Sequence, residues 1–310
     1  MTAARTTAAR RIALIGLGEV GQVLANDLHR DGRVDLSAWD RLFPVAGSEP
    51  HRAAAALTFL RAAGCTADAV SERPIVISAV TAGECRAAAH EAAAALTPGT
   101  FYLDLNSVSP GTKAEAARCI DEAGGRYIEA AVMSPIAPQR LASPVWLGGP
   151  HARDFLPHAQ SLGFAGAAVY SDTIGEASAA KMCRSVIVKG MEALLAESLL
   201  TARRHGVEDA VLASLEDLFP ARDWRKLARY MIARSLQHGR RRAEEMREAA
   251  RTVQEAGLEP WMSRGCVERQ QWAAGHTDAL RQQQLTDMLD NMLARVRSSA
   301  PQCSRQAKRR

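Results

Sequence analysis

The sequence predicts an α/β domain built on a doubly wound, largely parallel sheet, followed by an all-α domain. From residue 11 to about residue 172, short apolar runs typical of buried strands alternate with helical patterns, which favours a parallel sheet with helices on both faces. Beyond Asp172 only helical patterns follow. The first of them, over 174–205, contains no proline and predicts one long helix that joins the two domains.

The first elements are a strand, a glycine turn, a helix and a second strand that ends in an acid. Apolar runs at Ile12–Ile15 and Val34–Trp39 predict the two strands, and Asp40 follows the second. Between the strands, the turn GLGEVG consists of Gly16, Leu17, Gly18, Glu19, Val20 and Gly21, and a helical pattern follows it. This order of elements is typical of a dinucleotide-binding unit of the Rossmann type.

Each glycine of the turn has a physical task in such a unit. Gly16 permits the tight turn, Gly18 lets the backbone approach a pyrophosphate, and Gly21 lets the helix pack close to the sheet. The first N–H groups of the helix attract the phosphates. Asp40 lies about 20 residues beyond the glycines, where a carboxylate accepts hydrogen bonds from ribose hydroxyls. The alternative is a tight strand-to-helix turn that binds nothing.

The ends of later strands and the residue after Asp40 bear on the choice of cofactor. Val80, Thr81 and Asn106 come at the carboxyl ends of two predicted strands, where the nicotinamide of a dinucleotide would bind. Asp40 would repel the 2′-phosphate of NADP and therefore favours NAD. Arg41 is able to bind that phosphate or to stack on adenine, so NADP stays open as an alternative cofactor.

The remaining elements are predicted from local patterns. Alanine-rich and amphipathic stretches predict helices over 51–63, 83–96 and 110–124, with a short strand near 65–67. Further apolar runs predict strands at 74–80, 101–106, 127–132, 145–147 and 167–170. In the second domain, Gly206, Pro220, His238–Gly239 and 257–260 are expected to interrupt the helices.

Together these patterns divide the 310 residues into four parts. We expect a disordered lead-in over 1–10, the dinucleotide-binding domain over 11–172, a helical substrate and dimerisation domain over 173–297, and a flexible basic tail over 298–310.

Composition and charge exclude several classes of function. The net charge of +5 comes with no nucleic-acid-binding motif and no interleaving of basic and aromatic residues, so we expect no nucleic-acid partner. No apolar run approaches the ~20 residues of a membrane span. The six cysteines are scattered and lack metal-ligand spacing, which indicates reduced thiols, no bound metal and a cytoplasmic location.

Lys181 is the candidate catalytic residue. It lies near the start of the long predicted helix, between alanine-rich turns, where partial desolvation would lower the pKa of its ammonium group. A lysine placed in this way passes protons at neutral pH. The alternative is a surface lysine on an amphipathic helix.

Three segments around these residues resemble the β-hydroxyacid dehydrogenase family, which includes 6-phosphogluconate and 3-hydroxyisobutyrate dehydrogenases. They are GLGEVGQVLANDL, which starts at Gly16, the strand end DLNS followed by Pro110, and the helical segment GEASAAK, whose last residue is Lys181. The resemblance covers about the first 200 residues. It implies that Lys181 is the general acid–base in hydride transfer between a nicotinamide cofactor and a small 3-hydroxy acid or related anionic alcohol.

The chain departs from the family pattern at two positions that contact substrate in the family. Ser185 stands where the family has an asparagine four residues after the lysine, so Arg184 or Asn106 would supply or share this contact. Ser134 matches the family's substrate serine only with a shift of one residue, and Pro135 beside it removes a backbone donor. By the resemblance Ser134 would contact the substrate, and the alternative is a turn serine before a proline.

The C-terminal part resembles the less characterised domain of phosphogluconate-dehydrogenase-like proteins in residues 238–246 and 257–260. His238, Arg241 and Arg242 lie within about one helical turn and would bind a substrate carboxylate or phosphate. The alternative is a solvated face paired with neighbouring glutamates. In the family, C-terminal helices complete the partner's active site, so the resemblance also implies a homodimer.

Two other functions stay open from these residues. Arg41 and the missing family asparagine favour an NADPH-dependent reductase of ketones or imines. The altered segment from Met133 to Ile136 favours a dinucleotide-binding module without chemistry.

Overall fold

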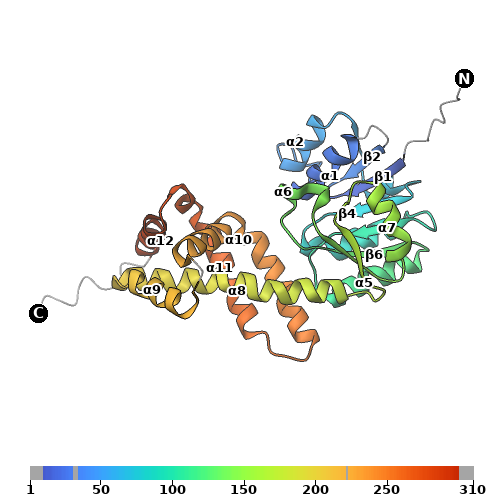
Figure 1. Cartoon of the computed structure of the whole chain (residues 1–310). Helices are drawn as coiled ribbons and strands as arrows, with labels where there is room; N and C mark the ends of the chain where they lie inside the picture. Colours follow the sequence, from blue (N-terminus) through green and yellow to red (C-terminus); the bar gives the residue numbers. More distant parts are fainter. Residues whose placement is uncertain (1–9, 31–33, 221–222, 300–310) are drawn as a thin grey trace, which may run out of the picture. The chain divides into compact units, whose positions relative to one another are not determined.

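The computed structural model describes residues 10–30, 34–220 and 223–299 (Figure 1). Contacts within the chain separate two compact units, the first made of 1–183 with 251–258 and the second of 184–250 with 259–310. The lead-in and tail expected at 1–10 and 298–310 lie outside the described residues, except that Arg10 opens the first strand and residues 298–299 belong to the last helix.

One eight-stranded sheet, in the order β3-β2-β1-β4-β5-β6-β7-β8, forms the centre of the first unit. Its strands are β1 (Arg10–Ile15), β2 (Val34–Trp39), β3 (Leu60–Ala62), β4 (Ile75–Ser78), β5 (Phe101–Asp104), β6 (Arg126–Val132), β7 (Val145–Gly148) and β8 (Ala167–Ser171). Neighbouring strands pair in parallel except β6 and β7, so the last two strands run against the others. The predicted doubly wound, largely parallel sheet is confirmed.

Helices cover both faces of this sheet. Successive side chains of a strand point to opposite faces of the sheet, so β1 contributes to two hydrophobic cores. Ile12 and Leu14 belong to the first core, and Ala13 and Ile15 belong to the second. The first core also holds residues of α1 (Glu19–Arg30) and α7 (Ala152–Ser161). The second holds residues of α3 (Thr66–Val70), α4 (Cys85–Ala93) and α5 (Pro110–Glu122).

The local predictions between residues 51 and 67 are wrong in two places. The helix expected over 51–63 is α2 (Glu49–Ala56), which ends early because Leu60 pairs with Leu36 of β2 and is buried there, so that 60–62 form the strand β3. The strand expected at 65–67 is instead the start of α3, whose first turn is capped by Cys65. Two further helices, α6 (Ile136–Gln139) and α7, were not predicted, and each of them contains a proline.

The long predicted helix is confirmed as α8 (Glu176–His205), with 30 residues and a length of about 45 Å. After it come α9 (Glu208–Leu218), α10 (Trp224–Glu255), α11 (Trp261–Ala273), the 3₁₀ segment η3 (Ala274–Arg281) and α12 (Leu285–Ser299). The break expected at 238–239 is a kink inside α10, where His238 has a non-helical φ of −123°. A Cβ on Gly239 would lie 2.5 Å from the carbonyl oxygen of Gln270, so glycine lets α10 and α11 approach closely.

Apolar side chains of α8, α10 and α12 form the core of the second unit. They include Leu199, Ile232, Leu236, Met288 and Met292, all fully buried or nearly so. The predicted all-α architecture of this part is confirmed. Within the described ranges, none of the helices combines the length and the apolar character that crossing a membrane requires.

Candidate active site

The glycine turn after β1 has close contacts that only glycine tolerates. Gly16 has a φ of +94°, and a Cβ there would lie 2.4 Å from the carbonyl oxygen of Ala79. A Cβ on Gly21 would lie 2.1 Å from the carbonyl oxygen of Gly16, so glycine lets α1 begin this close to the turn. Gly18 differs, because a Cβ there would meet no described atom within 4 Å.

Gly18 faces a cavity of about 320 Å³ near the carboxyl ends of β1, β2 and β4. The cavity is also lined by Gly16, Asp40, Arg41, Val80, Thr81, Glu49, Glu84 and Glu91. Of the other turn residues, Leu17 is buried, whereas Glu19 and Val20 open α1. The open backbone at Gly18, the helix N-terminus and the carboxylate of Asp40 fit the pyrophosphate and ribose of a dinucleotide.

The carboxylate of Asp40 also holds the turn together. Its Oδ2 accepts a hydrogen bond from the backbone N–H of Leu17 at 2.8 Å, and its Oδ1 accepts one from Leu42 at 2.9 Å. Each oxygen keeps a second lone pair for a ribose hydroxyl. Beside it, Nη1 of Arg41 lies 2.8 Å from Oε1 of Glu84, so the arginine is engaged by an acid from the loop after β4.

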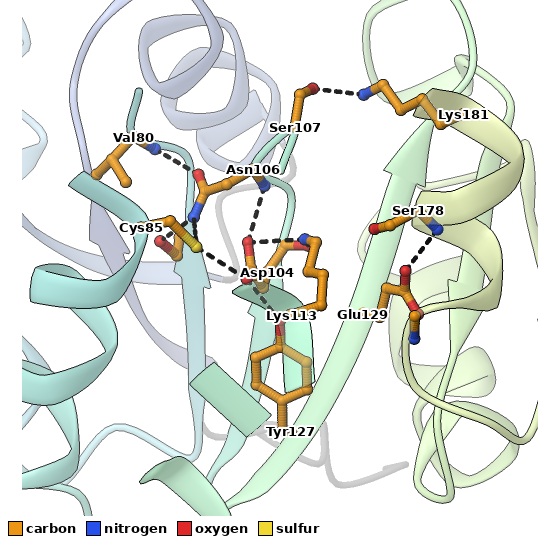
Figure 2. A network of polar contacts seen from close by, with 12 residues as sticks. Val80, Cys85, Asp104, Asn106, Ser107, Lys113, Tyr127, Glu129, Ser178 and Lys181 are labelled. Carbon is orange, nitrogen blue, oxygen red and sulfur yellow. Dashed lines mark hydrogen bonds and ion pairs between the residues drawn. The ribbon is translucent and has the colours of Figure 1, made fainter. Parts of the chain in front are cut away.

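Asn106 ties the ends of β4 and β5 together (Figure 2). Its Oδ1 accepts a hydrogen bond from the backbone N–H of Val80 at 2.7 Å, and its Nδ2 donates to Oγ of Ser78 at 3.0 Å. The side chain is only 3% exposed. Both ends of the amide are therefore engaged by the protein, and contacts of Asn106 with cofactor or substrate stay predictions.

A buried ion pair between Asp104 and Lys113 lies next to Asn106 (Figure 2). Oδ1 of Asp104 accepts from Nζ of Lys113 at 3.0 Å and from the backbone N–H of Asn106 at 2.8 Å. The hydroxyl of Tyr127 donates to Oδ2 at 2.6 Å, and burial together with this negative charge raises the pKa of Tyr127. The role of Lys113 was not predictable from the sequence, because nothing in its helical pattern separates it from an exposed lysine.

Lys181 reaches the loop that follows β5 (Figure 2). Its Nζ donates a hydrogen bond to Oγ of Ser107 at 2.6 Å. Lys181 is partly buried, and Ser107 directly follows Asn106 at the carboxyl end of this central strand. Both residues belong to the first unit, as does the glycine turn.

Glu129 of β6 fixes the start of the helix that carries Lys181 (Figure 2). Its side chain is fully buried, and its two carboxylate oxygens accept hydrogen bonds from the backbone N–H groups of Gly175 at 2.6 Å and Ser178 at 2.5 Å. A carboxylate at a helix N-terminus satisfies free N–H groups and complements the helix dipole. This role of Glu129 was not predicted, although an acid inside an apolar strand is a signal for it.

A second glutamate caps α5, the helix that follows Ser107. Oε1 of Glu255 accepts a hydrogen bond from Oγ of Ser109 at 2.8 Å, and its Oε2 accepts one from the backbone N–H of Gly111 at 3.0 Å. Glu255 lies in the segment 251–258, which belongs to the first unit although it ends a helix of the C-terminal half. Glu255 lies so far along the chain from α5 that no local pattern indicates this contact.

The residues near Lys181 that were expected to contact substrate differ in burial and in their hydrogen-bond partners. Oγ of Ser134 is buried and has no hydrogen-bond partner among the described residues. Oγ of Ser185 lies within 3.3 Å of Nζ of Lys189, and Arg184 is exposed. These roles stay predictions.

The three basic residues expected to form an anion site each have their own partner. Arg242 is buried against Glu192. Arg241 is more exposed and lies 3.0 Å from Glu245, and Nε2 of His238 lies 2.9 Å from Nη1 of Arg234. In the described ranges, no group of three or more His, Cys, Asp or Glu side chains is arranged to hold a metal ion.

Comparison with known proteins assigns both halves of the chain. Residues 11–152 match the NAD binding domain of 6-phosphogluconate dehydrogenase, and residues 202–273 match a domain of unknown function, DUF1932. The crystal structure of a conserved hypothetical protein from Sinorhizobium meliloti 1021 is 33% identical, with 93% of this chain and 97% of that chain covered and a TM-score of 0.71.

Two further relatives connect the chain with dehydrogenases. A conserved protein of unknown function, described as structurally similar to 3-hydroxyacid dehydrogenases, is 30% identical over 85% of this chain and 97% of that chain, with a TM-score of 0.64. The mitochondrial 3-hydroxyisobutyrate dehydrogenase of Homo sapiens is 23% identical over 69% of this chain and 63% of the human protein. The chain therefore belongs to the family of proteins that combine an NAD binding domain of the 6-phosphogluconate dehydrogenase type with a C-terminal DUF1932 domain, and it is a distant relative of the 3-hydroxyisobutyrate dehydrogenases.

Proposed function

We propose that the protein is an NAD-dependent oxidoreductase acting on a small 3-hydroxy acid or related anionic alcohol, with Lys181 as the general acid–base. The observation that carries this proposal is the 2.6 Å hydrogen bond from Nζ of Lys181 to Oγ of Ser107. The amine thus lies at the carboxyl end of a central strand, in the same unit as a cavity whose lining suits the pyrophosphate and ribose of a dinucleotide.

Lys181 has one task in this reaction, the movement of a proton. A bound nicotinamide supplies or accepts the hydride. In the oxidative direction the amine of Lys181 takes the proton of the substrate hydroxyl, and in the reductive direction the ammonium returns it to the carbonyl oxygen. The hydroxyl of Ser107 orients the amine, and Glu129 keeps the first turn of α8 fixed to the sheet.

The charges around the cavity favour NAD over NADP. Four carboxylates line it, those of Asp40, Glu49, Glu84 and Glu91, and they would repel the additional phosphate of NADP. Arg41, which the reductase alternative would use to bind that phosphate, is paired with Glu84. The pairing supports the NAD-dependent reaction.

The substrate class rests on the distant likeness to 3-hydroxyisobutyrate dehydrogenase and on the structural similarity to 3-hydroxyacid dehydrogenases described for the relative that is 30% identical. Ser185 stands where the family has an asparagine, and its side chain is shorter. Its hydroxyl already accepts a hydrogen bond from the ammonium group of Lys189. We therefore expect a substrate whose anionic group is held differently from that of 3-hydroxyisobutyrate.

The test is turnover of a panel of 3-hydroxy acids with NAD, followed by the absorbance of NADH. We expect Lys181→Met to lose at least about 100-fold in kcat, since a positioned acid–base contributes that much or more, while NAD binding stays within about twofold of the native value. Lys226→Met, which removes a lysine from α10, serves as the matched control. Unchanged turnover in Lys181→Met would remove the proposed role, and NAD binding without turnover of any panel member would favour the non-catalytic alternative.

A further inference from the structure

We propose that Glu84 determines the cofactor specificity of the site, because it holds Arg41 away from the 2′-phosphate of NADP. The inference rests on the proposed dinucleotide site and names the side chain that makes the distinction.

The Arg41–Glu84 pair joins two loops at the cavity. Arg41 follows β2 directly after Asp40, and Glu84 ends the 3₁₀ turn η1 (Ala82–Glu84) that follows β4. Both residues line the cavity, with 2.8 Å between Nη1 of Arg41 and Oε1 of Glu84. The side chain of Arg41 is 66% exposed and that of Glu84 is 31% exposed, so the pair is accessible to a ligand.

Arg41 is the only cationic side chain among the described residues that line this cavity. Recognition of a 2′-phosphate uses an arginine next to the acid position, since a guanidinium binds a phosphate through two charge-assisted hydrogen bonds. Here that guanidinium already has a carboxylate partner. A 2′-phosphate would have to displace Glu84 and would remain next to its negative charge.

Asp40 is less suitable than Glu84 for a substitution that tests the discrimination between NAD and NADP. Both of its oxygens accept backbone N–H groups, from Leu17 and Leu42, so its replacement would disturb the turn as well as the ribose contact. Glu84 is held by an ion pair at the surface, and such pairs contribute little to stability. Its carboxylate can therefore be changed without loss of the fold.

The experiment measures dissociation constants of NAD and NADP by calorimetry on the full-length protein. We expect Glu84→Gln to bind NADP about fivefold more tightly than the native protein, because a released arginine gains charge-assisted bonds in a partly screened site. Its affinity for NAD should change less than about twofold, because NAD carries no 2′-phosphate. The gain should disappear in the double variant Arg41→Gln/Glu84→Gln.

Glu49→Gln is the matched control, because it removes one carboxylate from the same cavity and leaves the Arg41–Glu84 pair intact. A gain for NADP in Glu49→Gln equal to that in Glu84→Gln would overturn the inference and assign the effect to net charge. A gain that persists in the double variant would also overturn it. If the native protein binds NAD and Glu84→Gln gains nothing, only this inference fails, whereas a native protein that binds neither dinucleotide contradicts the proposed function itself.

Discussion

The guanidinium of Arg242 lies against the carboxylate of Glu192 inside the second unit, where the two side chains are 9% and 3% exposed. Burial raises the pKa of Glu192 and lowers the pKa of Arg242, although each attracts the charge of the other. The loss of solvation therefore outweighs the attraction. A buried pair of this kind makes each charge dependent on its partner rather than adding stability.

We predict that Arg242→Leu lowers the free energy of unfolding by about 3 kcal/mol, because Glu192 is left as a buried charge without its guanidinium. The double variant Glu192→Leu/Arg242→Leu should lose much less, since both charges leave the interior together. Urea unfolding of the single and double variants measures the difference. Arg241→Leu, which removes a more exposed pair with Glu245, is the control and should change stability by less than about 1 kcal/mol. A double variant no more stable than Arg242→Leu would contradict this explanation.

His276 should make the second unit less stable in acid. Burial lowers the pKa of His276, so the unfolded chain, with a histidine pKa of about 6.5, binds the proton more readily than the folded protein. Stability present above pH 6.5 is therefore lost as the pH falls toward the lowered pKa. Urea unfolding at pH 8 and pH 5 should show a smaller decrease for His276→Gln than for the native protein. The exposed His205 provides the control, and an equal change in His205→Gln would refute the assignment.

Glu129→Gln should loosen the start of α8. An amide in place of the carboxylate presents an N–H₂ group to one of the two backbone donors, at Gly175 or Ser178, and we expect a loss of about 2 kcal/mol. Hydrogen exchange should show faster exchange of these amides while the core strands remain protected. Glu176→Gln, an exposed acid in the same first turn, should leave the exchange unchanged. Similar exchange in both variants would mean that Glu129 does not hold the helix.

The glycines of the turn should separate folding from binding. Gly21→Ala is expected to destabilise the protein strongly, because the added Cβ would lie 2.1 Å from a backbone oxygen. Gly18→Ala should leave thermal unfolding nearly unchanged, since its Cβ meets no described atom, but it should weaken NAD binding about tenfold or more because the methyl group enters the cavity at the pyrophosphate. Native NAD affinity in Gly18→Ala would show that the dinucleotide does not pass this residue.

The fold was predictable because its signals are local. The glycine turn, the apolar strand runs and the proline-free stretch of α8 each lie within a few dozen residues and follow from backbone geometry. The edge strand β3 was not predictable, because Leu60 takes its conformation from pairing with Leu36. The glutamates that cap α8 and α5 were even less predictable, because their partners are distant in the sequence. Glu129 accepts from a backbone N–H 46 residues away, and Glu255 accepts from one 144 residues away.

The position of Glu255 has a consequence for how the chain can be divided. The first unit consists of 1–183 together with 251–258, so its sequence is interrupted by most of the second unit. A fragment that stops at Cys183 would leave the N–H of Gly111 and the hydroxyl of Ser109 without the carboxylate that meets them. During synthesis, the last residues of the first unit therefore emerge only after residues 184–250, and an exchange of this unit between relatives would have to carry 251–258 along with 1–183 to keep these two hydrogen bonds.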